Sequence, residues 1–141
     1  MAAVRRKDTK PELIVRRMLY REGFRYRLHR KGLPGSPDLV FPKQRVAIFV
    51  HGCFWHGHPG CRYATVPKTR REFWLAKVEA NRARDARAEE ALRKQGWTVF
   101  VIWECETRKP DELRQRLFAR LPSINPKFDL PISGPIGQRG S

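Results

Sequence analysis

The chain has 141 residues, of which 30 are Lys or Arg and 14 are Asp or Glu, so its formal net charge is +16 at pH 7. This length suits one domain with a single hydrophobic core, and the positive charge predicts attraction to polyanions, with nucleic acid as the first candidate. No apolar run reaches the roughly 20 residues that a membrane helix needs, and no apolar segment follows the basic N-terminus as in a secretory signal, which argues against a membrane or secreted protein.

The first predicted element is a helix that begins after Thr9 and ends before Gly23. Thr9 and Glu12 have the spacing of a capping box, in which each side chain binds a backbone amide of the first turn. Apolar residues recur along one side of this segment and arginines along the other, and glycine is a common helix stop. We therefore expect an amphipathic helix near the start of the domain.

Three short strands are predicted next. Residues 24–29 alternate apolar or aromatic side chains with basic ones, which suits a half-buried strand. Residues 38–41 and 46–50 are mainly apolar, and the four residues between them include a proline. Two short strands across a turn of that length predict a β-hairpin.

The second half of the chain predicts two helices and one strand. A second capping-box pattern at residues 69–72 precedes a long helix over 73–95, and residues 97–103 form the most strongly β-like run. A last helix is expected over 110–121, and residues 122–141, rich in Pro and Gly, are expected to form a flexible tail. The order of elements predicts one α/β domain that starts at residue 1, ends at residue 121 and holds a mixed sheet between helices.

Three cysteines and a histidine form a pattern that is typical of a metal site. Cys53, His58 and Cys61 lie within nine residues, and Cys105 follows the last predicted strand. A Cys3His set suits the tetrahedral, thiolate-rich coordination of structural zinc, and four protein ligands leave no open position for catalysis. The alternative is that these thiols are small buried hydrophobic groups.

A carboxylate and two imidazoles are expected near the open end of the hairpin. Asp38 begins one strand and His51 follows the end of the next, so their side chains would converge. Aspartate is a normal ligand for Mg²⁺, and His56 could act as a general base near neutral pH. Each residue also has an ordinary interpretation, since Asp38 could cap a turn and His51 could be a buried core imidazole. Glu12 could serve only the capping box.

Five segments carry a family resemblance. In chain order they are Lys7-Asp8-Thr9-Lys10-Pro11-Glu12, Pro37-Asp38-Leu39-Val40, Phe49 to His56 (Phe-Val-His-Gly-Cys-Phe-Trp-His), Thr69 to Trp74 (Thr-Arg-Arg-Glu-Phe-Trp), and Gly96-Trp97 with Val101-Ile102-Trp103-Glu104-Cys105. These segments resemble the very-short-patch repair (Vsr) DNA mismatch endonucleases. The resemblance covers nearly all of residues 5–106, and the string from His51 to His56 is its most specific part.

The resemblance implies a restriction-endonuclease-like fold and an enzyme that nicks double-stranded DNA 5′ to the thymine of a T:G mismatch. Such mismatches arise when 5-methylcytosine deaminates. Carried over by position, Asp38 would hold a catalytic Mg²⁺, the backbone carbonyl of Val50 would be a second ligand, and His56 would activate the attacking water. His51 and Glu12 would hold metal-bound waters in place.

The resemblance also implies a structural zinc site and a DNA wedge. The zinc ligands would be Cys53, His58, Cys61 and Cys105. Phe54 and Trp55 would insert into the base stack beside the mismatch, and the alternative for both rings is core packing. The expected partner is duplex DNA with a T:G mismatch, with accessory mismatch-repair proteins as further candidates, and the expected state is a cytoplasmic, nucleoid-associated bacterial monomer.

Three functions remain open on the sequence. The first is a mismatch-specific nicking endonuclease, and the second is a related nuclease with a restriction or defence role on paired or modified DNA. The third is a zinc-stabilised DNA-binding module without catalysis. Asp38 and His56 argue against the third function, because a binding module needs neither. The sequence does not separate the first two, because base readout depends on side-chain placement in space.

Overall fold

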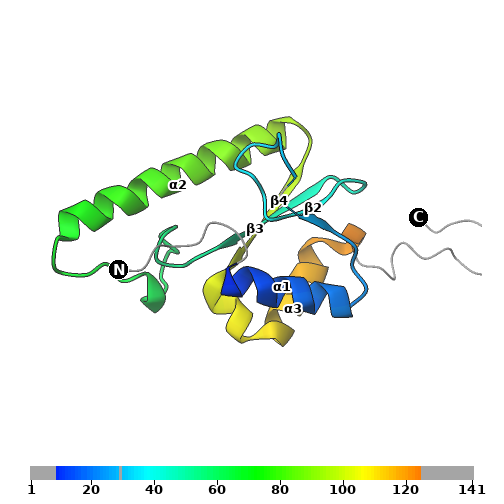
Figure 1. Ribbon diagram of the computed structural model, residues 1–141, viewed down its shortest axis with the longest axis horizontal. Coiled ribbons are helices and arrows are strands. Elements are labelled where there is room, and N and C mark those ends of the chain that lie inside the picture. Colours follow the sequence, from blue (N-terminus) through cyan, green and yellow to red (C-terminus); the bar gives the residue numbers. More distant parts are fainter. Residues whose placement is uncertain (1–8, 29, 125–141) are drawn as a thin grey trace, which may run out of the picture.

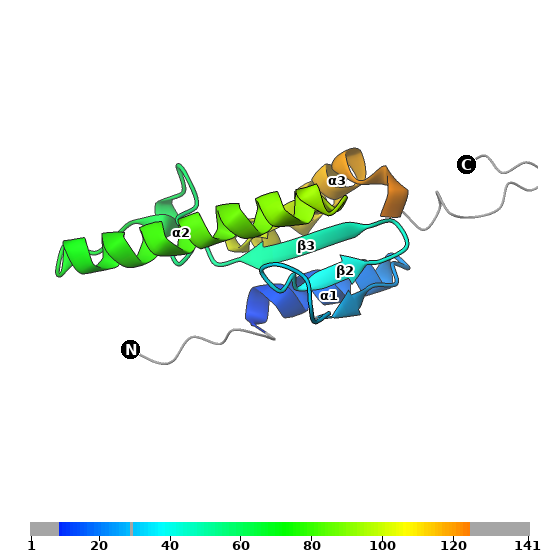
Figure 2. The ribbon, with the colours of Figure 1, turned by 90° about the horizontal axis from the view of Figure 1, so that it is seen from above.

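The structure, a computed structural model, describes residues 9–28 and 30–124 and contains a four-stranded sheet in the order β1-β2-β3-β4. The strands are β1 (Arg27–Leu28), β2 (Leu39–Phe41), β3 (Val46–His51) and β4 (Thr98–Trp103). The helices are α1 (Lys10–Arg21), α2 (Arg71–Lys94) and α3 (Pro110–Arg120), joined by the 3-10 turns η1 (Arg62–Ala64), η2 (Glu104–Arg108) and η3 (Pro122–Ile124). Helix α2 crosses one side of the sheet, and α1 and α3 lie on the other (Figure 1, Figure 2).

The sheet is mixed, as expected from the order of elements. Strands β1, β2 and β3 pair antiparallel, whereas β3 and β4 pair parallel, from Val46 opposite Thr98 to His51 opposite Trp103. A parallel pair needs a long crossover connection, and α2 forms most of it. Because parallel strands end at the same edge, the segments that follow β3 and β4 emerge side by side. The predicted α/β fold class with its β2–β3 hairpin is confirmed.

Apolar side chains on the two faces of the sheet form two core clusters. The larger cluster packs α1 and α3 against the sheet, and its members include Val15, Leu19, Leu39, Ile48, Ile102, Leu113 and Leu117. The smaller cluster packs the end of α2 against the other face, through Val40, Ala47, Phe49, Leu92 and Trp97. Strand β3 is therefore covered on both faces, which explains its nearly continuous apolar sequence.

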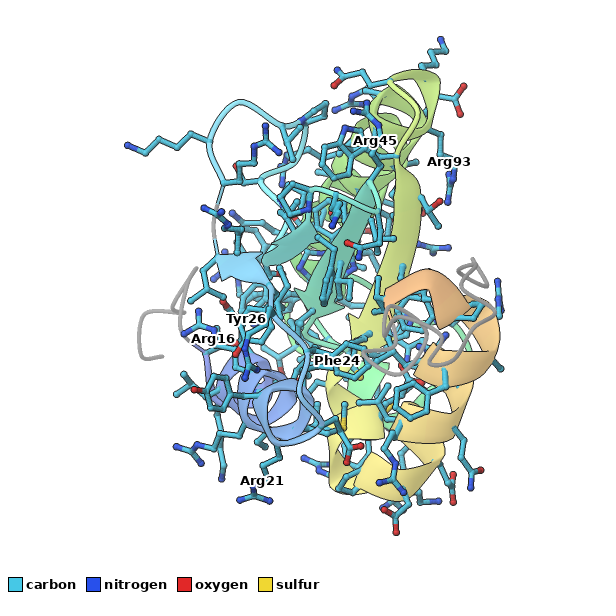
Figure 3. All side chains as sticks on the ribbon, turned by 90° about the vertical axis from the view of Figure 1, so that its right-hand side faces the viewer. Arg16, Arg21, Phe24, Tyr26, Arg45 and Arg93 are labelled. Atoms are coloured by element: carbon cyan, nitrogen blue, oxygen red, sulfur yellow. The ribbon has the colours of Figure 1, made fainter. Side chains whose placement is uncertain are left out.

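Phe24 closes the larger core where the chain leaves α1. Its ring is 1% exposed and lies 5.6 Å from the Phe118 ring and 6.1 Å from the Phe41 ring, between centroids. Figure 3 shows Phe24 pointing between α1 and α3, whereas Arg21 points outward from the end of α1. The helix ends before Gly23, which has φ 91°, as the sequence predicts.

The strand predicted over residues 24–29 is much shorter in the structure. Only Arg27–Leu28 pairs with β2, and both side chains are exposed because β1 is the edge strand. Phe24 precedes the strand and belongs to the core. The alternating sequence pattern therefore combines one buried core residue with the exposed residues of an edge strand. His29 lies outside the described residues.

Of the two predicted N-caps, the one at Thr9 forms and the one at Thr69 does not. At α1, Thr9 is the N-cap and its Oγ1 accepts a hydrogen bond from the Glu12 amide at 3.3 Å. At α2, the N-cap is Arg70 in the left-handed conformation, with no side-chain capping bond. The Arg70 guanidinium lies 4.3 Å from the centroid of the Phe73 ring. Helix α2 begins at Arg71, one residue later than a helix capped by Thr69 would begin.

The ordered domain extends past the boundary expected after residue 121. Residues Pro122–Ile124 form η3, and Ile124 is 3% exposed within the larger core cluster. The rest of the predicted tail, residues 125–141, lies outside the described part of the chain. Within the described residues, no helix is both long and apolar enough to cross a membrane.

Candidate active site and metal cluster

Asp38 is held against the backbone at the end of β3. Its Oδ2 accepts a hydrogen bond from the Val50 amide at 2.7 Å, and its own amide donates to the Ile48 carbonyl at 2.9 Å. The amide and the carbonyl of one strand residue point to the same side, so the Val50 carbonyl faces the same edge of β3 as the amide that binds Asp38. A carboxylate and a backbone carbonyl are therefore available at the same point of the sheet edge.

The surroundings of Asp38 disfavour its negative charge. Burial raises the pKa of Asp38 to about 7, the Val50 hydrogen bond lowers it, and the nearby Glu12 carboxylate raises it. Glu12 is 1% exposed and forms an ion pair with Arg16 at 2.5 Å, so its side chain points inward from the first turn of α1. A bound cation would stabilise the neighbouring carboxylates of Asp38 and Glu12 at this partly buried site.

Two imidazoles stack beyond the end of β3. The rings of His51 and His56 are nearly parallel, with an interplanar angle of 3° and a centroid distance of 3.9 Å. Burial lowers the pKa of His51 to about 4, and the neighbouring His56 also lowers it, so His51 is neutral at pH 7. Only 5% of His51 is exposed, whereas 28% of the His56 side chain reaches solvent.

A carboxylate on α2 orients His56. The Nδ1 of His56 lies 2.6 Å from Oδ2 of Asp85, a residue 29 positions further along the chain. An ionised carboxylate only accepts hydrogen bonds, so Nδ1 donates and Nε2 is left with its lone pair. His51, His56 and Asp85 place one potential ligand atom each within 4.8 Å of one another. This arrangement suits an imidazole that accepts a proton at Nε2.

The four expected zinc ligands come together in one Cys3His group, which we call the metal cluster. Ligand atoms of Cys53, His58, Cys61 and Cys105 lie within 4.8 Å of one another. The Nδ1 of His58 is 3.6 Å from the Cys53 sulfur and 3.5 Å from the Cys105 sulfur. Tetrahedral zinc with bonds of about 2.3 Å to sulfur and about 2.0 Å to nitrogen requires sulfur–nitrogen separations of about 3.5 Å. The cluster can therefore hold a metal ion of this size.

The metal cluster and the imidazole stack share one tryptophan. The indole of Trp103 stacks on His58 at a centroid distance of 4.2 Å and an angle of 8°. The same ring meets His51 edge to face at 5.4 Å, and His51 in turn stacks on His56. Trp103 thus connects a ligand of the metal cluster to the candidate catalytic imidazoles.

An aromatic cluster lies between the imidazoles and the start of α2. Phe54, Trp55 and Trp74 meet edge to face, with centroid distances of 5.0 to 5.8 Å. All three are only half-buried, and none belongs to either core cluster. The Asn81 side chain on α2 donates to the Trp55 carbonyl at 2.7 Å, which ties the ring-bearing loop to the helix.

Gly57 lets this loop approach α2 closely. It has φ 60°, and a Cβ at this position would lie 2.7 Å from Cγ1 of Val78 and 2.8 Å from Cδ of Arg82. A larger residue would therefore push the loop away from the helix, in addition to its conformational strain. The turn at Gly57 lies between the rings of Phe54 and Trp55 on one side and His58 on the other, so it sets the position of both groups.

Two residues of this site were not assigned roles from the sequence. Asp85 lies in a helix crowded with charged residues, and no short-range spacing relates it to His56. Trp74 lies in one of the segments that carry the family resemblance, but its position in the aromatic cluster becomes visible only when α2 is docked on the loop. The one available signal was that Trp74 is aromatic and lies at the start of the helix that follows the loop.

Comparisons with known proteins point to one family. The family model described as DNA mismatch endonuclease Vsr matches residues 1–62. The type II nicking enzyme V.XorIIP of Xanthomonas oryzae pv. oryzae is 56% identical over 117 residues, covering 83% of this chain and 85% of the relative. The DNA mismatch endonuclease Vsr of Escherichia coli K12 is 42% identical over 113 residues, covering 80% of this chain and 72% of the relative.

A solved structure supports the fold. The catalytic domain of the homing endonuclease I-Bth0305I superposes with a TM-score of 0.56 at 19% identity, covering 82% of this chain and 97% of that domain. The four-stranded mixed sheet with flanking helices is thus an endonuclease fold, as the restriction-endonuclease-like expectation stated. Taken with the two relatives above, these findings establish that the chain belongs to the DNA mismatch endonuclease Vsr family and is a DNA endonuclease, a hydrolase.

Proposed function

We propose that this protein is a Mg²⁺-dependent endonuclease that nicks double-stranded DNA 5′ to the thymine of a T:G mismatch left by deamination of 5-methylcytosine. The observation that carries this proposal is the position of Asp38 on the Val50 backbone, at the same sheet edge as the His56–Asp85 pair. A metal-binding carboxylate and a poised imidazole are the two groups that metal-assisted hydrolysis of a phosphodiester requires. The mismatch endonuclease of E. coli among the relatives supports the substrate.

The Mg²⁺ would be held by the Asp38 carboxylate and the Val50 carbonyl. Both are oxygen ligands, and Mg²⁺ commonly binds one or two protein oxygens while keeping several waters. When bound, Mg²⁺ supplies positive charge that offsets the charge developing on the phosphate and the leaving oxygen. Glu12, held inward by Arg16, and the neutral His51 would accept from or donate to the waters around the ion.

His56 is the proposed general base, and Asp85 is its positioning residue. The hydrogen bond at Nδ1 fixes the tautomer in which Nε2 accepts a proton from the attacking water. The stacked His51 ring fixes the plane of the His56 ring. His56 therefore combines a defined orientation with access to solvent.

The aromatic cluster is the proposed mismatch wedge. Phe54 and Trp55 were expected there, and Trp74 meets both rings edge to face from the first turn of α2. Inserting apolar rings costs about a few kcal/mol per unstacked base step. A mispaired step is the least costly to open, so the wedge itself would favour a mismatch over paired DNA.

The metal cluster is the proposed structural zinc site. Its four protein ligands would close the coordination shell, which excludes a catalytic role for this ion. Burial raises the pKa of the Cys53 thiol to about 12. Bound zinc would lower this pKa, because the ion favours the thiolate.

A second candidate function is nicking of paired or modified DNA in a restriction or defence role. The names of two relatives favour it, since the proteins of X. oryzae (56% identical) and Neisseria meningitidis (44% identical) are both called type II nicking enzymes. The same catalytic residues would serve either function, and only substrate choice differs.

Substrate choice separates the two functions. With Mg²⁺ present, we expect nicking of a duplex that carries one T:G mismatch, on the thymine strand, and no nicking of the fully paired duplex. Strand-specific end labels on a gel measure this directly. Equal cleavage of both duplexes would move the assignment to the restriction-type function.

The Mg²⁺ requirement should depend on pH through Asp38. Because the pKa of this carboxyl is raised to about 7, protons compete with Mg²⁺ below that pH. The Mg²⁺ concentration for half-maximal nicking should therefore rise as pH falls from about 8 to about 6, approaching tenfold per unit at the acid end. Asp38→Asn, which keeps an oxygen for the Val50 amide, should abolish nicking but retain DNA binding. A Mg²⁺ requirement that does not change with pH would contradict the role of Asp38.

Asp85 should act only through His56. His56→Ala should lower kcat by about 10²-fold or more, and Asp85→Asn by a smaller factor with little change in DNA affinity. The double variant should be no slower than His56→Ala, and Asp85→Glu should recover part of the rate. Asp111→Asn is a matched control, because the Asp111 side chain is 90% exposed on α3. Additive losses in single-turnover assays would show that Asp85 has a separate role.

Purified protein should contain about one zinc ion per chain, as expected for one closed four-ligand site. Cys105→Ala should lose the ion and change the tryptophan fluorescence, because Trp103 stacks on the ligand His58. His56→Ala should keep the ion, since His56 is not part of the cluster. Metal analysis that finds no zinc in the wild-type protein would remove the proposed site.

A further inference from the structure

A basic hollow shares Cys105 with the metal cluster and none of its lining residues with the candidate active site. It has a volume of about 540 Å³, and it is bounded by η1, η2 and the first turns of α3. Its lining includes the metal-cluster residue Cys105 and the side chains of Arg62, Tyr63, Arg108 and Arg116. None of these four side chains has a role in the proposed catalytic mechanism.

Two guanidinium groups converge on one tyrosine in this hollow. The Arg62 guanidinium lies 4.9 Å from the centroid of the Tyr63 ring, and that of Arg108 lies 4.3 Å from it. Arg62 also donates a hydrogen bond to the Tyr63 hydroxyl at 2.9 Å. The ring is 43% exposed, so the stack stands at the surface and not in the core. Tyr63 thereby orients both guanidiniums before any ligand arrives.

The positive charge of this pair is not neutralised within the described residues. Arg116, in the same hollow, forms two 2.7 Å contacts with Glu106 and also donates to the Val101 carbonyl at 2.9 Å. By contrast, Arg62 and Arg108 have no ion pair with a carboxylate in the part of the chain that is described. Two like charges held near one ring repel each other, and an anion between them would relieve that repulsion.

The chemistry of the pair favours a phosphate group. Guanidinium groups present planar forks of N–H donors that match the oxygens of a phosphate. Lys109 brings the basic side chains in the lining to four, against the two carboxylates of Glu106 and Glu112, so the hollow is positive on balance. The duplex proposed as substrate presents phosphates along its whole backbone, and η1 directly follows the metal-cluster residue Cys61 in the same loop that carries Phe54 and Trp55.

We propose that Arg62 and Arg108 together bind one backbone phosphate of the DNA duplex, in the hollow that the metal-cluster residue Cys105 helps to line. This inference rests on the proposed function only in taking duplex DNA as the substrate. The contact would fix the position of the duplex without reading sequence, since phosphates carry no base information. It would also place the metal-cluster loop between two points of DNA contact.

The test measures DNA binding as a function of salt, with the full chain in its zinc-loaded form and Asp38→Asn as the background to prevent cleavage. The variant pair Arg62→Gln/Arg108→Gln is compared with the control pair Lys31→Gln/Lys43→Gln. Both pairs remove two exposed charges, but Lys43 lies in the β2–β3 turn, at the opposite end of β3 from His51. Fluorescence anisotropy with labelled T:G and fully paired duplexes gives Kd at each salt concentration.

The arginine pair should weaken binding about tenfold or more relative to the control pair, as expected for lost hydrogen bonds to a charged group. The slope of log K against log salt should fall in magnitude by about 0.9, corresponding to one phosphate, and equally on both duplexes. A slope equal to that of the control pair overturns the proposal, and so does a loss confined to the T:G duplex, which would indicate base readout.

This outcome can be told apart from failure of the proposed function. If the wild-type enzyme does not prefer the T:G duplex but the arginine pair still loses one unit of salt slope, the phosphate contact stands and the substrate assignment fails. If mismatch nicking is established and the slope does not change, the contact fails alone. Zinc content and circular dichroism of the variant confirm that the loop is still folded.

Discussion

The parallel pairing of β3 with β4 is the constraint on which the rest of the structure depends. The register places His51 beside Trp103, so Cys53 and Cys105 each follow two residues after a paired position. The Cys105 amide donates to the Cys53 sulfur at 3.4 Å, which shows how closely the two segments continue together. A shift of one residue in this register would turn the side chains to opposite faces and separate the ligands.

The same pairing couples the metal cluster to the candidate catalytic groups. His58 stacks on Trp103, Trp103 meets the edge of His51, and His51 stacks on His56. A structural ion at the metal cluster, as proposed, would order His58 and with it the face against which His51 packs. Such an ion would affect the reaction without approaching the substrate, through ring contacts that reach the proposed general base His56.

The sequence predicted what depends on local spacing and missed what depends on how α2 docks. The hairpin, the Thr9 cap and the grouping of Cys53, His58 and Cys61 follow from residues close in the chain, and Cys105 follows from the end of the last predicted strand. The structure places all of them as expected. The positions of Asp85 and Trp74 depend on which face of a 24-residue helix meets the loop, and charged residues occur all around that helix. The cap at Thr69 failed for a related reason, because a left-handed Arg70 sets the start of α2.

The electrostatics of the site oppose those of the whole chain. The protein carries a net charge of +16, yet at its candidate active site His51 is neutral and Asp38, with its raised pKa near 7, is only partly ionised. The surface charge attracts DNA to the protein over a long range, whereas Asp38 and His51 would hold little charge until the proposed cation and a phosphate bind. Each of the two would then favour the other, since the cation ionises Asp38 and the phosphate stabilises the cation. Metal binding and substrate binding are therefore expected to be linked in this fold.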